Sequence, residues 1–258
     1  MTPLTLLTIG GLALAVLALV RQTLRAIAAR LTARAHYFSA AAALFDKVTQ
    51  RTEPSGFARL AGQWQGLTFD LQAVPDTLTF RKLPTLWVMV TLTEAQPVRT
   101  ALHIMARPGQ NDIFSRFGTM PVSVALPPAF PEYCALRCQD AALLPPEPVI
   151  SAQATLFDDP AVKELVIAPG GLRLVFLADE AERGGYLLFR DAEMGRNPIA
   201  ADRLLPHLEA LTRLARTLKR DAEKWLPVFR ESHATTKEQD QDDGSVRHHP
   251  DRKDQPDD

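Results

Sequence analysis

The sequence contains only two cysteines, Cys134 and Cys138, which stand close together in the run "CALRC". On a helix the two side chains would share one face, whereas on a strand they would lie too far apart for a disulfide. A structural zinc site needs four ligands, and no second pair of Cys or His stands at metal-ligand spacing. We interpret the two cysteines as partly buried, reduced thiols of a cytoplasmic domain.

The sequence also lacks a strong net charge and the motifs of common catalytic sites. A formal net charge of −1 provides no electrostatic field for nucleic acid, so no nucleic-acid partner is expected. The run Pro169–Gly171 is not a phosphate loop, because no Gly-Lys-Ser/Thr element follows it. There is no nucleophile elbow and no paired metallohydrolase histidine, and His103 is interpreted as a structural residue. The sequence therefore predicts no cofactor and no metal.

Charged residues are absent from Pro3 to Val20, where Leu, Ala, Val and Ile dominate. About 20 apolar residues at a rise of 1.5 Å cover roughly 30 Å, which is the hydrocarbon thickness of a bilayer. A cleaved secretory signal would carry basic residues before a shorter apolar core, and no Lys or Arg precedes this run. We therefore predict an uncleaved transmembrane anchor over residues 1–20, with a signal peptide or a buried soluble helix as the alternatives.

Four basic residues follow this run: Arg21, Arg25, Arg30 and Arg34. Basic flanks stay on the cytoplasmic side of a membrane span, so the body of the protein is expected in the cytoplasm. The four arginines are the candidate membrane-surface contacts, and each would add about 1 kcal/mol next to anionic headgroups. The bilayer itself is the expected partner of residues 3–20.

Two stretches carry apolar or small residues at alternating steps of four and three, which places each set on one helical stripe. The first stretch predicts a basic stalk helix over 21–50, and the second predicts a long helix that covers a sheet. We expect Leu31 or Phe38 to lie against Leu211 or Leu218, with a coiled coil between two chains as the alternative. The stripes are Leu24, Ala28, Leu31, Ala35, Phe38, Ala42 and Phe45, then Leu204, Leu208, Leu211, Ala215, Leu218, Ala222 and Trp225.

Between the helical stretches the apolar pattern changes to short β-rich runs that end at Pro and Gly. The run "RLAGQWQGLTFDLQAV" predicts a hairpin that turns at Gln65-Gly66, and "GG" at 170–171 and "RGG" at 183–185 predict further turns. Strands follow one another without an intervening helix, which indicates an antiparallel meander. The other strand-like runs are "TLTF", "TLWVMVTLT", "VRTALHIMAR", "VSVAL", "ELVIAP", "LRLVFL" and "YLLFR", and residues 151–157 form a candidate short helix.

The predicted fold class is α+β: a transmembrane helix continuing into a stalk helix, an antiparallel β-rich body packed by a long C-terminal helix, and a disordered tail. A hydrophobic share of 46% suffices for a buried core, and residues 56–226 are predicted to form the globular domain. Residues 231–258 contain Val246 as their only large aliphatic side chain and no aromatic one. They bury too little apolar area to offset their ordering entropy, so they are predicted to be a disordered acidic tail.

The run "NDIFSRFGTMPVSVALPPAFPEYCALRCQD", followed by "LFDDPAVKELVIAPGGLRLVFL", places the aromatic pair Phe114 and Phe117 before a strand. A helix-like segment and an apolar strand pattern around Gly-Gly-Leu come next. This order resembles a pattern in membrane-anchored bacterial proteins of unknown function, which carry an amino-terminal span and an α+β body. The resemblance implies a single-pass protein of the bacterial inner membrane and transfers no functional residue.

Two functions from different classes fit these features. The first is a non-catalytic module, tethered to the membrane, that acts in protein interaction or scaffolding with an unidentified protein partner. The alternative is a membrane-associated enzyme of the hydrolase class, with a pocket between sheet and helices. An exposed apolar groove or an unpaired sheet edge would favour the first. Converging polar side chains with shifted pKa values would favour the second.

Overall fold

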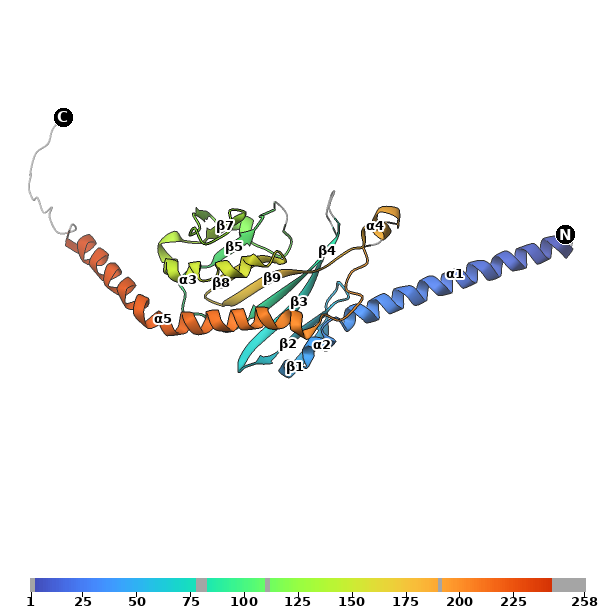
Figure 1. Ribbon diagram of the computed structural model, residues 1–258, viewed down its shortest axis with the longest axis horizontal. Coiled ribbons are helices and arrows are strands. Elements are labelled where there is room, and N and C mark those ends of the chain that lie inside the picture. The colour runs from blue at the N-terminus through green and yellow to red at the C-terminus, as the bar shows by residue number, and fades with distance from the viewer. Residues whose placement is uncertain (1–2, 78–82, 110–111, 190–191, 243–258) are drawn as a thin grey trace, which may run out of the picture.

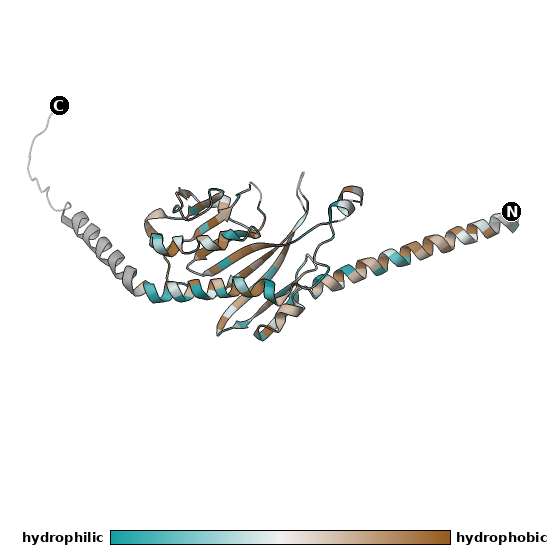
Figure 2. Ribbon diagram, in the orientation of Figure 1, coloured by the Kyte–Doolittle hydropathy of each residue, from teal (hydrophilic) through white to brown (hydrophobic). Residues whose placement is uncertain are grey.

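The first helix, α1 (Pro3–Ala35), projects away from the folded body over most of its length (Figure 1). This computed structural model describes residues 3–77, 83–109, 112–189 and 192–242. Within those ranges, the N-terminal helix is the one that is long and apolar enough to cross a membrane, and the body buries none of its most apolar part. In Figure 2 the colours of hydrophobic residues predominate along the ribbon of α1. The predicted long apolar N-terminal helix is confirmed as a candidate span by length and composition.

The helix predicted over residues 21–50 ends at Ala35, so that prediction is wrong beyond this residue. The chain turns here because Tyr37 and Phe38 are both buried in the core of the body. The Tyr37 ring contacts the rings of Phe38 and Phe57 edge to face, at centroid distances of 5.2 and 5.5 Å. The segment after the turn forms helix α2 (Ser39–Ala42) and strand β1 (Asp46–Thr52).

Nine strands of the described chain form one sheet, and every neighbouring pair is antiparallel. Their order is β1-β2-β3-β4-β9-β8-β5-β7-β6, so β1 and β6 are the outer strands. The first four strands form the predicted meander, and the fourth pairs with the last one in the sequence. The remaining bounds are β2 (Ala58–Trp64), β3 (Leu67–Asp76), β4 (Thr85–Leu92), β5 (Leu102–Ala106), β6 (Val122–Val124), β7 (Cys134–Cys138), β8 (Val162–Ala168) and β9 (Gly171–Glu180).

Two predicted turns are confirmed and one is wrong. The β2–β3 hairpin turns at Gln65-Gly66, and the β8–β9 hairpin turns at Gly170, with Gly171 already in β9. The "RGG" turn and the "YLLFR" strand are wrong, because helix α4 (Arg183–Phe189) occupies this segment. Since β9 is already flanked by β4 and β8, a strand that turned back from it would find no free edge. Most of "TLTF" lies outside the described residues.

Short helices fill the connections between the later strands. The candidate helix over 151–157 is observed as the last residue of α3 and most of η3, a 3-10 helix that carries the buried Phe157. These short elements are η1 (Phe117–Thr119), η2 (Ala141–Leu143), α3 (Glu147–Ser151) and η3 (Ala154–Asp158).

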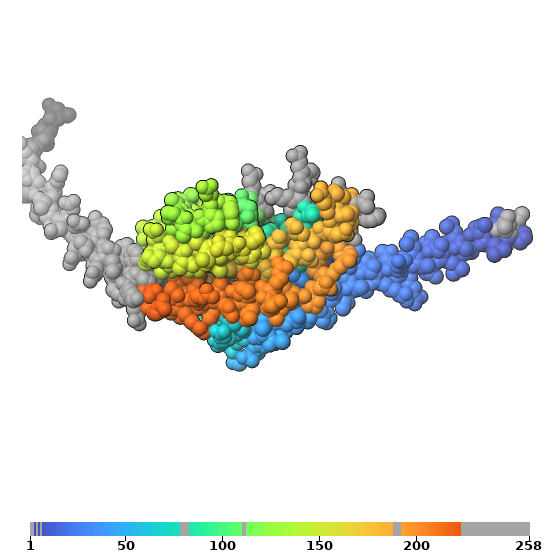
Figure 3. Space-filling model, viewed as in Figure 1, coloured from blue at the N-terminus to red at the C-terminus, as the bar shows by residue number. Residues whose placement is uncertain are grey.

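The first part of the C-terminal helix, α5 (Ala201–Asp242), lies across one face of the sheet, and its later part extends away from the body (Figures 1 and 3). Its predicted stripe is buried from Leu204 to Ala222, while the side chain of Trp225 lies outside the described part. The stripe joins one core with apolar residues of the sheet, such as Leu71 and Leu174. Each large aliphatic side chain buried there contributes roughly 1.5–3 kcal/mol. The predicted α+β class, with an antiparallel sheet covered by a long C-terminal helix, is confirmed.

The N-terminal segment enters the apolar core through residues after α1, and the expected packing of Leu31 on α5 is wrong. Leu31 is 51% exposed and lies beside Gly56. Phe38 is fully buried in the same core as Leu211 and Leu218, and α2 packs against α5. The predicted stripe from Leu24 to Phe45 therefore does not lie on one helix, because α1 ends at Ala35 and the rest of the stripe follows the turn.

The helix α5 continues to Asp242, so residues 231–242 of the predicted disordered tail are helical. The segment is poor in apolar residues, which excludes a packed core but not a solvated helix, because Ala, Glu, Lys and Gln all have favourable helix propensity. Residues 243–258 lie outside the described part of the chain.

Candidate functional site

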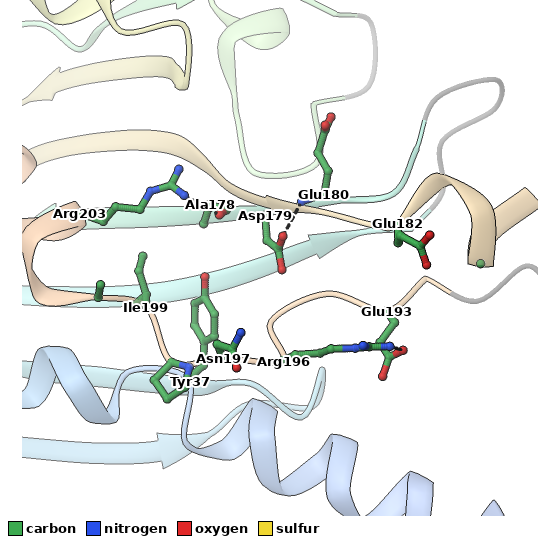
Figure 4. Close-up of a pocket in the computed structure, with 13 residues that line it drawn as sticks. Tyr37, Ala178, Asp179, Glu180, Glu182, Glu193, Arg196, Asn197, Ile199 and Arg203 are labelled. Atoms are coloured by element: carbon green, nitrogen blue, oxygen red, sulfur yellow. Dashed lines mark hydrogen bonds and ion pairs between the residues drawn. The ribbon is translucent and has the colours of Figure 1, made fainter.

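A half-open pocket of about 760 Å³ lies where α1 meets the body (Figure 4). Four parts of the chain line it: the turn after α1, the end of β9 with the start of α4, the segment before α5, and the first turn of α5. We name it the stalk-base pocket. Its lining residues are Tyr37, Ala178, Asp179, Glu180, Glu182, Gly185, Glu193, Arg196, Asn197, Pro198, Ile199, Ala200 and Arg203.

The carboxylate of Asp179, near the end of β9, is fixed in this pocket by two backbone N–H groups. The N–H of Glu180 donates to Oδ1 at 2.9 Å, and the N–H of Gly195 donates to Oδ2 at 2.8 Å. Within the described part of the chain, no cationic side chain forms an ion pair with Asp179. The carboxylate therefore keeps an uncompensated charge and one further acceptor direction on each oxygen.

The segment before α5 reaches Asp179 because residue 195 is a glycine. Gly195 has a φ of 68°, and a Cβ at this position would lie 2.6 Å from Cε1 of Phe57 and 3.2 Å from Cδ2 of Leu86. No other residue accommodates both this backbone conformation and this close approach. The contact with Phe57 sets the position from which the Gly195 N–H reaches the carboxylate.

The hydroxyl of Tyr37 points into the same pocket, towards Asp179 (Figure 4). The residue is only 2% exposed, yet its hydroxyl makes no hydrogen bond to any described residue. Burial raises the pKa of Tyr37, the nearby Asp179 carboxylate raises it further, and Arg203 has the opposite effect. The hydroxyl therefore stays protonated and can both donate and accept a hydrogen bond. The hydroxyl oxygen is not fully buried, so it is open to the pocket, where a ligand can replace water at it.

Both arginines of the pocket already contact protein groups. Arg203 donates to the carbonyl groups of Leu177 and Ala178 at 2.9 and 3.2 Å. Arg196 pairs with Glu193, whose carboxylate also lies 3.3 Å from the guanidinium of Arg30 in α1. The hydrogen bond from Arg196 lowers the pKa of Glu193. These contacts hold α1 and the segment before α5 together at the rim of the pocket.

The stalk-base pocket carries an excess of negative charge, because four of its lining residues are carboxylates and two are arginines. Glu193 is paired, whereas Asp179, Glu180 and Glu182 form no ion pair within the described residues. In the same part of the chain, no three side chains of His, Cys, Asp or Glu are placed to hold a metal ion. The carboxylates thus surround a volume without converging on one point, which suits an organic cation.

A second polar cluster lies beneath the segment between β5 and β6. The Nδ1 atom of His103 lies 2.7 Å from Oε1 of Glu164, and the Ser115 hydroxyl donates to the same oxygen at 2.5 Å. The N–H of Phe117 donates to the Ser115 oxygen at 2.9 Å. Activation of a serine nucleophile needs a contact with the imidazole, and Ser115 contacts the carboxylate instead. These hydrogen bonds hold the segment between β5 and β6 against the sheet. This is the kind of structural role that the sequence suggested for His103.

The cysteines Cys134 and Cys138 lie in strand β7, which decides between the two conformations left open by the sequence. Both thiols are free. Burial raises the pKa of each thiol, so the reactive thiolate form is disfavoured. Neither residue lines the stalk-base pocket.

The four arginines predicted to contact the membrane fall into two pairs. Arg21 and Arg25 are exposed on α1. Arg30 pairs with the glutamate at the pocket rim, and the Arg34 guanidinium lies 5.2 Å from the centre of the Phe57 ring. The second pair therefore holds α1 to the body, and headgroup contact stays a prediction that best fits the first pair.

Sequence reasoning missed the pocket. One local signal was present, because Asp179, Glu180 and Glu182 directly follow the apolar strand run "LRLVFL". The contributions of Tyr37 and Gly195 carry no such signal, since each depends on a contact between distant parts of the chain.

No protein-family model, no curated protein and no solved structure matches this chain. The resemblance to membrane-anchored bacterial proteins of unknown function stays a prediction. The function is therefore inferred from the geometry of the site.

Proposed function

We propose that this chain is a single-pass membrane protein whose body is a non-catalytic binding module, and that this module binds an organic cation in the stalk-base pocket. The observation that carries the proposal is a negatively charged cavity at the base of α1, with Asp179, Glu180 and Glu182 uncompensated among the described residues. All three residues are exposed at the pocket, and a cleft lined by charges of one sign raises the local concentration of counter-ions.

The composition of the lining favours binding over covalent catalysis. The lining residues include no Ser, Thr, Cys, His or Lys, so a nucleophile or base in this pocket would have to be a carboxylate. Tyr37 stays protonated because burial raises its pKa, so it acts as a hydrogen-bonding group. The hydrolase alternative would need two of the carboxylates to act as nucleophile and acid, whereas Asp179 accepts hydrogen bonds from two backbone N–H groups, which favour its charged form.

The pocket is also a better candidate than the sheet edge at β1. Strand β1 is exposed along its whole length, but a register shift between Asp46 and Thr49 interrupts its pairing with β2. Lys47 lies in this irregular part with a φ of 50°. Bulges and charged residues at an outer strand oppose the addition of a further strand. A partner that binds this module is therefore proposed to use the pocket.

We place the body on the cytoplasmic side of a bacterial inner membrane, with Arg21 and Arg25 close to anionic headgroups. The support is the basic flank that follows the apolar part of α1. A reporter that is active only in the periplasm, fused after Asp258, should therefore be silent, while a cytoplasmic reporter should be active. The reverse pattern would overturn this orientation.

Binding of organic cations by the full chain in mild detergent tests the proposed function. A cation at about 100 times its dissociation constant should stabilise the body by roughly 2.7 kcal/mol and raise its melting temperature, whereas anions of similar size should not. Glu182→Gln removes one uncompensated charge and should weaken this effect. Glu209→Gln is the matched control, because it makes the same change at an exposed position of α5 outside the pocket. Equal responses of the two variants, or no response to any cation, would contradict the proposal.

A further inference from the structure

Two groups in the stalk-base pocket have acceptor positions that no described residue fills. Each oxygen of Asp179 accepts one backbone N–H, at 2.9 and 2.8 Å, and has one acceptor direction left. The Tyr37 hydroxyl has no hydrogen-bond partner among the described residues, although the residue is only 2% exposed. Figure 4 shows the hydroxyl pointing towards the carboxylate from the opposite wall. A ligand placed between them would need N–H or O–H donors.

We infer that the stalk-base pocket recognises a primary ammonium group, which donates hydrogen bonds to the Asp179 carboxylate and to the Tyr37 hydroxyl oxygen. The inference rests on the proposed binding of an organic cation and adds which kind of cation is bound. An ammonium group combines a positive charge with three donors. A quaternary ammonium has the charge but no N–H, so it would displace water from both acceptors without replacing the lost hydrogen bonds.

The arginines of the pocket suit a ligand that carries a negative group next to its ammonium. Arg203 and Arg196 line the same cavity as Asp179. The Arg196 side chain is 70% exposed, so an anionic group can approach it from solvent. A phosphoethanolamine group has this pair of charges. Because the pocket lies at the base of α1, the ammonium could come from a phospholipid headgroup or from a free amine, and the chemistry of recognition is the same.

The variant Tyr37→Phe separates recognition from folding. It removes only the hydroxyl, which has no hydrogen bond to a described residue, and it keeps the ring contacts with Phe38 and Phe57. The melting temperature of the ligand-free chain should therefore be unchanged within error. The dissociation constant for ethanolamine, measured by calorimetry on the full chain in detergent, should rise roughly tenfold or more, as expected for a lost hydrogen bond to a charged group.

The quaternary analogue choline provides the second comparison. Choline should bind the wild-type chain at least tenfold more weakly than ethanolamine does, and Tyr37→Phe should reduce this difference. If choline binds the wild type as well as ethanolamine does, or if Tyr37→Phe binds ethanolamine like the wild type, the ammonium inference is wrong and the cation site remains. If neither cation binds, the proposed function fails together with the inference.

Nanodiscs distinguish the two sources of the ammonium group. One set contains phosphatidylethanolamine and phosphatidylglycerol, and the other contains phosphatidylcholine with the same share of phosphatidylglycerol. If the headgroup is the ligand, the first lipid mixture should raise the melting temperature and reduce binding of free ethanolamine. If a free amine is the ligand, ethanolamine should bind equally in both. Either result supports ammonium recognition, provided that Tyr37→Phe weakens the effect in the same assay.

Discussion

Replacing Gly171 with alanine should lower the free energy of unfolding by roughly 3–5 kcal/mol. Gly171 begins β9 with a φ of 151°, a conformation that costs other residues about 1–3 kcal/mol. An added Cβ would lie only 2.3 Å from the backbone oxygen of Leu92 in the neighbouring strand β4. A backbone oxygen in a sheet cannot move aside as a flexible side chain does. Denaturant unfolding of the full chain in mild detergent measures the effect.

The neighbouring glycine is a matched control for this substitution. A Cβ at Gly170 would meet no atom within 4 Å, and this residue does not have a positive φ. Gly170→Ala should therefore change the stability by less than about 1 kcal/mol, in either direction. Similar losses for the two variants would show that the close approach of β9 to β4 does not control the stability of this hairpin.

Acidification should destabilise the body through His207, a residue on the buried face of α5. Its ring lies on the ring of Phe176 at a centroid distance of 4.1 Å, and the residue is 7% exposed. Burial lowers the pKa of His207 from 6.5 to about 4, while Asp159 raises it and Arg203 lowers it. Between these two pKa values the unfolded chain binds more protons than the folded one, so stability decreases as the pH falls. The loss amounts to about 3 kcal/mol when the pH has fallen to the folded pKa value.

The variant His207→Phe isolates this contribution, because it keeps a ring in the core and removes the titrating group. The free energy of unfolding should be measured from pH 7.5 to pH 4.5 for both chains. Carboxylates whose pKa is lowered in the folded chain, such as Glu193, also reduce the stability as the pH falls. Their contribution is the same in both proteins, so it cancels in the difference between the two curves. The wild type should lose about 2–3 kcal/mol more than the variant over this range. Parallel curves would show that His207 titrates alike in the folded and unfolded chains.

The elements that were predicted well are those whose buried residues recur at a regular, short spacing in the sequence. The stripe from Leu204 to Ala222 repeats at helical steps, and it is the stripe that α5 buries. The hairpin at Gln65-Gly66 is marked by turn residues between two alternating runs. Such features depend on near neighbours in the sequence, so one sequence suffices to find them.

The elements that were missed depend on contacts between distant segments. The helical spacing continued through Phe38, and nothing local shows that Tyr37 and Phe38 enter the core and end α1. The stalk-base pocket exists because Gly195 approaches Phe57 and because its N–H reaches Asp179. Similarly, "YLLFR" has the composition of a strand, but β9 has no free edge for it. The end of α1, the pocket and the absence of a strand at "YLLFR" all depend on the topology of the sheet and its contacts, which a local pattern of residues does not predict.

The pairing of β4 with β9 also determines the order in which the sheet can be completed during synthesis. Residues 93–170 must be made between these two strands, although Trp87 lies opposite Leu177 in the finished sheet. At typical synthesis rates of 5–20 residues per second, β4 waits on the order of ten seconds for its second neighbour. During this interval its edge can pair with another nascent chain. Crowded expression should therefore lead to aggregation at this step, before the finished protein exists.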